Sequence, residues 1–122
     1  MPIVDVEIVV GEGGTIDADL APKLADAVGA VLGTTPGRTW VRVRALPDAH
    51  YAEDGGGPPA GIRPVFVTVL KSMRPEGERL REETRRLTEA IAAACDRPVE
   101  NVHVLWLPDA NGRMAFGGRL VE

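Results

Sequence analysis

The chain repeats itself at an interval of about 62 residues, and this repeat limits the possible folds more than any other feature of the sequence. Three pairs of prolines occupy equivalent positions in the two halves: Pro2 with Pro64, Pro36 with Pro98, and Pro47 with Pro108. The partners are 62, 62 and 61 residues apart. A duplicated chain of this kind builds its core from two similar supersecondary units, each of which needs the other to bury its apolar face.

The first half is predicted to form a strand, a helix and a second strand. Residues 3–10 alternate apolar with acidic side chains, as a half-buried strand does. Apolar residues then recur at helical spacing up to Gly33. A helix that starts around Asp17 to Asp19 keeps Pro22 in its first turn, where no amide donor is needed. Residues 40–46 alternate again and form the second strand.

The second half follows the same order. Residues 65–70 are predicted to form a strand, and Pro75 opens a helix that carries Leu80 and Leu87 on its buried stripe. Residues 102–107 are then the fourth strand. The second half therefore repeats the strand, helix, strand pattern of the first.

The helix of the second half also carries a dense run of charge. Arg79 with Glu83, and Glu82 with Arg86, are spaced four residues apart, which places each pair on one helix face. We interpret this run as a solvated surface of the helix and expect the ion pairs to form along it.

A strand, helix, strand unit of this length requires a crossover, so its two strands run parallel. Tandem β-α-β repeats predict an α/β (α+β) fold with a four-stranded mixed sheet and both helices on one face. Arg42 and Arg44 alternate with small apolar residues, so we expect them on the other face, toward a partner subunit or a cavity.

The whole chain, 1–122, is expected to be one domain. Repeat 1 spans 2–51 and repeat 2 spans 64–122, and a Gly/Pro-rich linker at 52–63 joins them. A chain of 122 residues with 44% hydrophobic and 26% charged residues is ordinary for one globular domain.

Charge and hydropathy exclude several classes of partner. A net charge of -4 and a pI near 5.2 argue against nucleic acid, which requires a basic surface. No apolar run approaches the roughly 18 residues that span a membrane, and no signal peptide is recognisable, so we expect a cytoplasmic protein that binds small molecules. His50 and His103 do not form a metal-binding pattern, and we interpret Cys95 as a buried hydrophobic residue of the second helix.

Four segments stand out together: the opening Met1-Pro2-Ile3-Val4, a turn that contains glycine, a strand with Val41-Arg42-Val43, and a closing Ala115-Phe116-Gly117-Gly118. In this combination they resemble 4-oxalocrotonate tautomerase and other members of the tautomerase superfamily. The resemblance covers nearly the whole chain, as two fused copies of a short subunit. It implies a duplicated β-α-β fold, a homotrimer, no cofactor, and removal of Met1 so that Pro2 becomes an amino-terminal amine.

The two halves differ at the positions where the resemblance implies cations. Seven and ten residues after Pro2 stand Val9 and Glu12, whereas the same offsets from Pro64 give Lys71 and Arg74. Pro64 lies inside the chain and is never an amine. We therefore predict one composite site, in which repeat 1 supplies Pro2 and repeat 2 supplies Lys71 and Arg74. The alternative is that both cations are surface charges ahead of a helix.

The resemblance also assigns roles to residues outside that cluster. Arg42 matches the second-strand arginine that polarises a substrate carbonyl, and the alternative is a structural ion pair with Asp5 or Glu7. Tyr51 is expected to wall the pocket or donate to a developing enolate. Trp106 and Phe116 are candidate substrate contacts, against the alternative of core or subunit-contact residues.

The implied activity is an enol–keto tautomerisation of a small 2-hydroxy-dienoic or 2-oxo acid. Neutral Pro2 would act as general base, because nearby cations and desolvation disfavour its protonated form. One alternative is a malonate semialdehyde decarboxylase-like or haloacrylate hydratase activity in which Pro2 is a general acid. The other alternative is a non-catalytic trimeric binding protein with the same fold.

Overall fold

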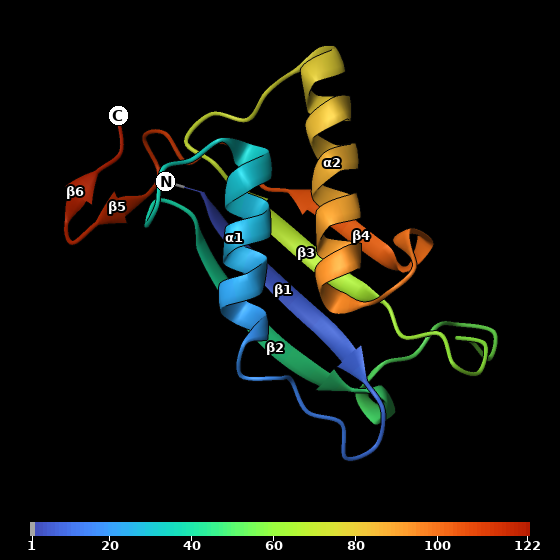
Figure 1. Cartoon of the computed structure of the whole chain (residues 1–122). Helices are drawn as coiled ribbons and strands as arrows, with labels where there is room; N and C mark the ends of the chain where they lie inside the picture. Colours follow the sequence, from blue (N-terminus) through green and yellow to red (C-terminus); the bar gives the residue numbers. More distant parts are fainter. Residues whose placement is uncertain (1) are drawn as a thin grey trace.

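A computed structural model describes residues 2–122 and shows one sheet covered by two helices on one face (Figure 1). The main elements are β1 (Ile3–Val10), α1 (Leu20–Leu32), β2 (Trp40–Pro47), β3 (Val65–Leu70), α2 (Gly77–Cys95) and β4 (Val102–Trp106). The strand order is β2-β1-β3-β4. Strands β1 and β2 are parallel, as are β3 and β4, and β1 pairs antiparallel with β3. The predicted four-stranded mixed sheet is confirmed.

Both helices start slightly later than the sequence pattern predicts. Helix α1 begins at Leu20 with Asp19 as its N-cap, so Pro22 still lies in the first turn. Helix α2 begins at Gly77 rather than at Pro75, with Glu76 in an extended conformation as the N-cap. Helix α1 ends at Gly33, whose φ of 69° is the left-handed conformation that glycine adopts without a Cβ clash.

The core lies between the helices and one face of the sheet. Alternate residues of the two central strands point into it, because successive strand side chains face opposite sides. The fully buried core side chains from strands and helices are Val4, Val6, Val65, Val67, Val69, Leu24, Val28, Leu87 and Ile91. The two repeats therefore share a single core, and the central β1–β3 pairing joins them.

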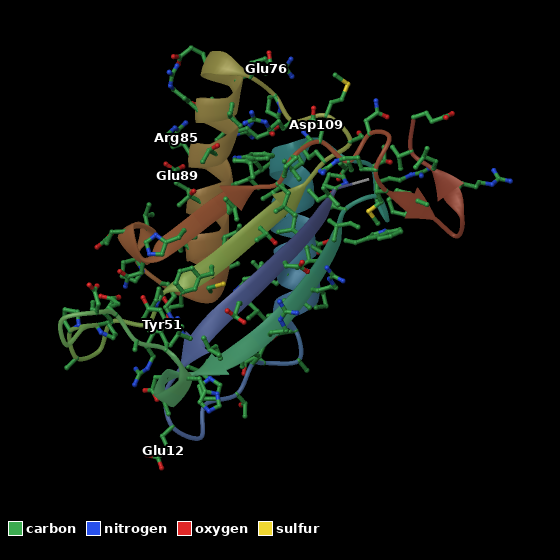
Figure 2. The ribbon with its side chains drawn as sticks, turned by 180° about the vertical axis from the view of Figure 1, so that it is seen from behind. Glu12, Tyr51, Glu76, Arg85, Glu89 and Asp109 are labelled. Carbon is green, nitrogen blue, oxygen red and sulfur yellow. The ribbon has the colours of Figure 1, made fainter. Side chains whose placement is uncertain are left out.

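The other sheet face, which we call the open face, is not covered by either helix (Figure 2). Register places on it Ile3, Asp5, Glu7, Trp40, Arg42, Arg44, Phe66, Thr68, Leu70, His103 and Leu105. Several of its large apolar side chains are half-buried or exposed, with Leu105 at 60%. Apolar side chains therefore remain exposed to solvent on this face of the single chain.

Shorter elements complete the fold. Two 3-10 helices, Asp48–His50 and Val99–Asn101, follow β2 and precede β4. A hairpin that the sequence pattern did not predict joins β5 (Ala115–Phe116) to β6 (Arg119–Leu120) near the C-terminus, and the start of β1 lies at the same end of the molecule (Figure 1). Within residues 2–122, no helix is long and apolar enough to cross a membrane.

Candidate active site

Pro2 lies directly before β1, at one end of the sheet, and is buried. Its carbonyl oxygen accepts a hydrogen bond of 3.0 Å from the backbone amide of Trp40 at the start of β2. On the other side of β1, Ile3 pairs with Leu70, so one further step of the antiparallel register sets Pro2 opposite Lys71. The sheet therefore brings the proline of repeat 1 to the end of β3, where the cations of repeat 2 begin.

Lys71 forms an ion pair with helix α2. Its Nζ lies 3.4 Å from Oε2 of Glu83, and the two side chains are only 21% and 18% exposed. The backbone carbonyl of Lys71 accepts a 2.8 Å hydrogen bond from the amide of Ala110. Lys71 is therefore directed toward the helix side of the sheet, where its charge meets a carboxylate.

This contact corrects the ion pairs expected along α2. Glu83 does not pair with Arg79; it pairs with Lys71 across the fold. The pairs that do form within the helix are Arg81 with Glu78, and Arg85 with both Glu82 and Glu89. They are solvent-exposed, as expected, but their partners are different.

Arg74 follows in the loop between β3 and α2. Its backbone amide donates a 2.9 Å hydrogen bond to Oδ1 of Asp109. Its side chain is exposed, and among residues 2–122 its guanidinium makes no ion pair. Arg113 lies in the adjacent C-terminal loop, but its guanidinium donates to the carbonyls of Pro108 and Asp109. Arg74 is thus a cation without a carboxylate partner at the Pro2 end of the sheet.

Two shallow hollows lie at this end. One, of about 430 Å³, is lined by Leu70, Ala110, Arg113, Met114 and Ala115. The other, of about 240 Å³, is lined by Gly37, Arg38, Trp40 and Phe116. Leu70 and Trp40 both pair with Ile3, so the hollows lie on either side of the start of β1. Both are open to solvent in the single chain.

Arg42 points to the open face, away from Lys71. Its guanidinium donates two hydrogen bonds, of 2.5 and 2.8 Å, to the carboxylate of Asp5. This hydrogen-bonded ion pair lowers the pKa of Asp5 and raises the pKa of Arg42. Of the alternatives for Arg42, the chain by itself forms the structural ion pair, with Asp5 as partner.

Tyr51 lies at the opposite end of the sheet from Pro2. Its hydroxyl donates a 2.7 Å hydrogen bond to Oε2 of Glu53, which raises the pKa of the phenol, and its ring lies 5.7 Å from that of Phe66. Figure 2 shows Tyr51 and Asp109 at opposite ends of the molecule. Within one chain Tyr51 therefore does not approach Pro2.

The two remaining aromatic candidates lie at the Pro2 end and already have partners. The indole nitrogen of Trp106 donates a 2.9 Å hydrogen bond to Oγ1 of Thr84, and the ring packs against the core beneath α2. Phe116 meets Trp40 edge-on, with ring centroids 5.2 Å apart. Their roles as substrate contacts stay predictions.

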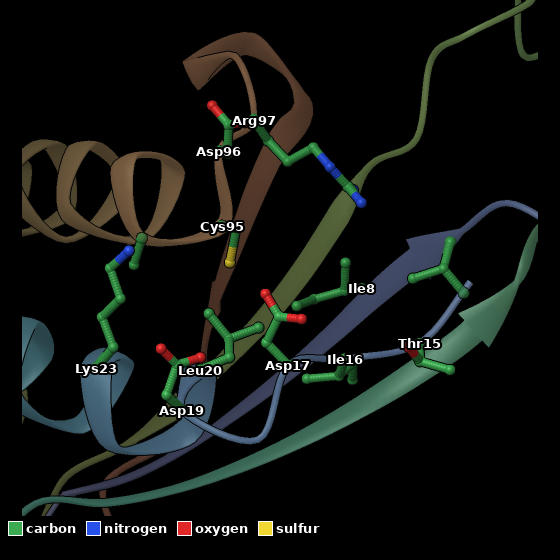
Figure 3. Close-up of a pocket in the computed structure, with 12 residues that line it drawn as sticks. Ile8, Thr15, Ile16, Asp17, Asp19, Leu20, Lys23, Cys95, Asp96 and Arg97 are labelled. Carbon is green, nitrogen blue, oxygen red and sulfur yellow. The ribbon is translucent and has the colours of Figure 1, made fainter.

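A separate cavity of about 280 Å³ opens at the other end of β1, between the start of α1 and the end of α2 (Figure 3). Cys95 lies in its wall, half-buried, near Lys23 and Arg97. Burial raises the pKa of the Cys95 thiol, and the two cations oppose that effect only in part. The thiol therefore behaves as a small hydrophobic group. Within residues 2–122, no cluster of three His, Cys, Asp or Glu side chains is arranged to hold a metal.

Known proteins resemble this chain in structure rather than in sequence. No family model and no curated protein matches the sequence. A crystal structure of native fused 4-OT is 22% identical, with 95% of this chain and 94% of that chain covered at a TM-score of 0.69. Macrophage migration inhibitory factor from Trichinella spiralis is 14% identical, with 97% and 98% covered at 0.73. A malonate semialdehyde decarboxylase inhibited by 3-bromopropiolate is 16% identical, with 94% and 88% covered at 0.69.

The chain has the tautomerase-superfamily fold. The similarity extends over both repeats and not over one β-α-β unit alone, since more than nine-tenths of the chain is covered in each case. At these identities the likeness establishes the fold, and the chemistry has to be argued from the side chains of this chain.

In this tautomerase fold, sequence reasoning missed Glu83 as a residue of the Pro2 end. The signal was present, because Glu83 stands three residues after Leu80 and four before Leu87, on the same stripe of α2. A carboxylate on the buried stripe of a helix requires a partner. The i to i+4 spacing with Arg79 concealed this, since it offered an apparent partner on the helix surface.

Proposed function

We propose that this chain is a cofactor-independent tautomerase, and that removal of Met1, which lies outside the described residues, frees Pro2 as the catalytic amine. The observation that carries the proposal is the antiparallel β1–β3 pairing, whose continuation sets Pro2 opposite Lys71, with Arg74 three residues further along. A proton acceptor and a free cation at one end of a sheet are what a small acidic enol requires.

The reaction is an isomerisation in two proton transfers. The neutral amine of Pro2 removes the proton from the hydroxyl of a 2-hydroxy-dienoic or enol acid, and a carbonyl forms as the carbon–carbon double bond shifts. The protonated amine then returns that proton to carbon, which yields the 2-oxo acid and restores the base. Arg74 holds the substrate carboxylate, and a nearby positive charge favours the neutral form of Pro2.

A homotrimer completes the proposed site. Arg42 and Tyr51 lie on the open face and at the far end of the sheet, so they reach a Pro2 site only from another copy of the chain. Two further fused 4-OT structures support this assembly, since one is a symmetric trimer and the other an asymmetric trimer. In the assembly, Arg42 or Tyr51 would stabilise the negative charge that develops on the substrate oxygen, and Trp106 and Phe116 would line the pocket.

A decarboxylase or hydratase with Pro2 as general acid is the second candidate. The observation in its favour is that two carboxylates, Glu83 and Asp109, lie at the Pro2 end. A negative charge near an amine favours the protonated form, which is the form that a general acid requires. The similarity in fold to malonate semialdehyde decarboxylase is compatible with this chemistry.

The decisive test is Pro2→Ala, assayed with phenylenolpyruvate. We expect kcat/KM to fall by about 10²- to 10⁴-fold, which is the usual contribution of a general base. Pro64→Ala is the matched control, because it changes the equivalent proline of the other repeat and should leave activity near that of the wild type. Intact mass of the purified protein should show loss of Met1.

The outcomes separate the three functions. Activity that rises with pH through the pKa of Pro2 supports the tautomerase, and activity that falls with pH supports the acid-type decarboxylase or hydratase. If Pro2→Ala ketonises phenylenolpyruvate at the wild-type rate, Pro2 is not the catalytic amine. No turnover by the wild type of phenylenolpyruvate, malonate semialdehyde or 3-haloacrylate would favour the binding protein.

A further inference from the structure

The Lys71–Glu83 ion pair differs from the other ion pairs of the chain in its burial. Both of its side chains are less than a quarter exposed, at 21% and 18%. Each other ion pair among the described residues has at least one partner that is more than 40% exposed. Exposed pairs are screened by water and salt, whereas a part-buried pair keeps its interaction. The Lys71–Glu83 pair is therefore screened less by solvent than the other ion pairs among the described residues.

The turn of α2 that carries Glu83 is fastened to the sheet. Oγ1 of Thr84, the next residue, accepts the 2.9 Å hydrogen bond from the indole of Trp106 on β4 and donates one of 2.6 Å to the carbonyl of Leu80. These bonds fasten this turn of α2 to the sheet. On the other side, the amide of Ala110 holds the backbone of Lys71. The backbone segments that carry the two partners are therefore fixed relative to each other.

The charges on the β3 side of Pro2 nearly cancel. Lys71 is balanced by Glu83, and Asp109 lies against the backbone of Arg74. Arg113 is oriented by two backbone carbonyls. On the β3 side of Pro2, three cations and two carboxylates leave a net charge of +1, so one substrate carboxylate on Arg74 uses the excess positive charge there; Arg38 lies on the β2 side, in the other hollow.

From this we infer that Glu83 is a positioning residue that neutralises Lys71 and restricts the site to enol acids with a single carboxylate. The inference rests on the proposed function. A dicarboxylate such as 2-hydroxymuconate brings a second negative charge, and on the Lys71 side of the site it meets a cation that is already paired, while Glu83 repels it. An uncompensated charge about 8 to 12 Å away, at an effective dielectric constant of about 20, corresponds to a preference of about 10- to 30-fold.

The test compares kcat/KM for phenylenolpyruvate and 2-hydroxymuconate. In the wild type we expect the monocarboxylate to be preferred by about 10- to 30-fold. Glu83→Gln frees the Lys71 charge, so the preference should fall by about tenfold or more, mainly through a lower KM for 2-hydroxymuconate. Glu83→Asp, which keeps the carboxylate, should retain most of the preference.

Glu82→Gln is the matched control, since Glu82 is the adjacent residue, is exposed, and pairs with Arg85 on the helix surface. Its preference should equal that of the wild type. Thermal melting checks that each variant folds. If Glu83→Gln does not fold, Lys71→Gln is the second variant, and removal of this cation should raise the preference for the monocarboxylate.

The failures of the two proposals are distinguishable. Pro2-dependent activity together with an unchanged substrate preference in folded Glu83→Gln would overturn the role of Glu83 alone. An equal change in Glu82→Gln would also overturn it, because the effect would then be one of general surface charge. Wild-type protein inactive on both substrates, or Pro2→Ala as active as wild type, would overturn the proposed function and this inference with it.

Discussion

Leu105→Glu should dissociate the proposed trimer without unfolding the chain. Leu105 lies on β4 and points to the open face, where 60% of its surface is exposed in the single chain. A glutamate is tolerated at so exposed a position. In an assembly that covers the open face, the same glutamate would place a charge in an apolar contact, where it has no partner.

The magnitude follows from the exposed fraction. Complete burial of a leucine side chain contributes about 1.5 to 3 kcal/mol, so burial of the remaining 60% contributes about 1 to 2 kcal/mol per copy. Three copies give about 3 to 5 kcal/mol per trimer. At about 1.4 kcal/mol for each factor of ten, the overall association constant should fall by about 10²- to 10⁴-fold from this term alone.

Sedimentation velocity over about 0.1 to 100 μM, a range that brackets the micromolar affinities of moderate complexes, measures the effect. Val99→Glu is the matched control, because Val99 is also an exposed hydrophobic residue, at 49%, but lies in the 3-10 helix before β4 and not on the open face. We expect it to assemble as the wild type does. If Leu105→Glu stays trimeric over the same range as the wild type, the open face is not the assembly surface and the reasoning fails.

Two further predictions concern the single chain. Leu87→Ala should lower the free energy of unfolding by about 2 to 5 kcal/mol in denaturant titrations, since Leu87 is fully buried, whereas Leu120→Ala in the exposed C-terminal hairpin should cost less than about 1 kcal/mol. The Arg42 pair lowers the pKa of Asp5 in the folded state, so its contribution to stability is present above the unfolded pKa near 3.9 and is lost as pH falls through the folded value. Melting temperatures of wild type and Asp5→Asn should therefore differ at pH 7 and converge below about pH 3; a constant difference would contradict this.

The sequence was sufficient for the four strands of the main sheet, the two helices and the fold class, but not for the C-terminal hairpin. Apolar residues recur with period two in β1 and β3 and with helical period in α1 and α2, and these periods follow from backbone geometry alone. The helix starts were less well predicted. Pro75 was expected to open α2, but the helix begins at Gly77, because a proline near a helix start is compatible with several boundaries.

The repeat also allowed a prediction of which side chains to compare. Residues at the same distance after Pro2 and after Pro64 occupy equivalent positions in a duplicated chain. Comparison of these positions identified Lys71 and Arg74 from the sequence alone. One further step of the β1–β3 register, beyond Ile3 and Leu70, sets Pro2 opposite Lys71. The sequence did not predict that Lys71 would pair with Glu83, because Glu83 is twelve residues away along the chain and had a nearer apparent partner in Arg79.

By itself, then, the sequence determined a duplicated β-α-β chain, because hydrophobic periodicity and the spacing of prolines are local properties. Only the tertiary structure decided that β1 and β3 are the strands that join the two repeats, that Glu83 meets Lys71, and that Tyr51 lies at the far end from Pro2. The physical reason is that these facts depend on strand order and on contacts between elements far apart in the chain. Such contacts form when the two repeats pack on their shared core, so the local sequence pattern of either repeat does not reveal them.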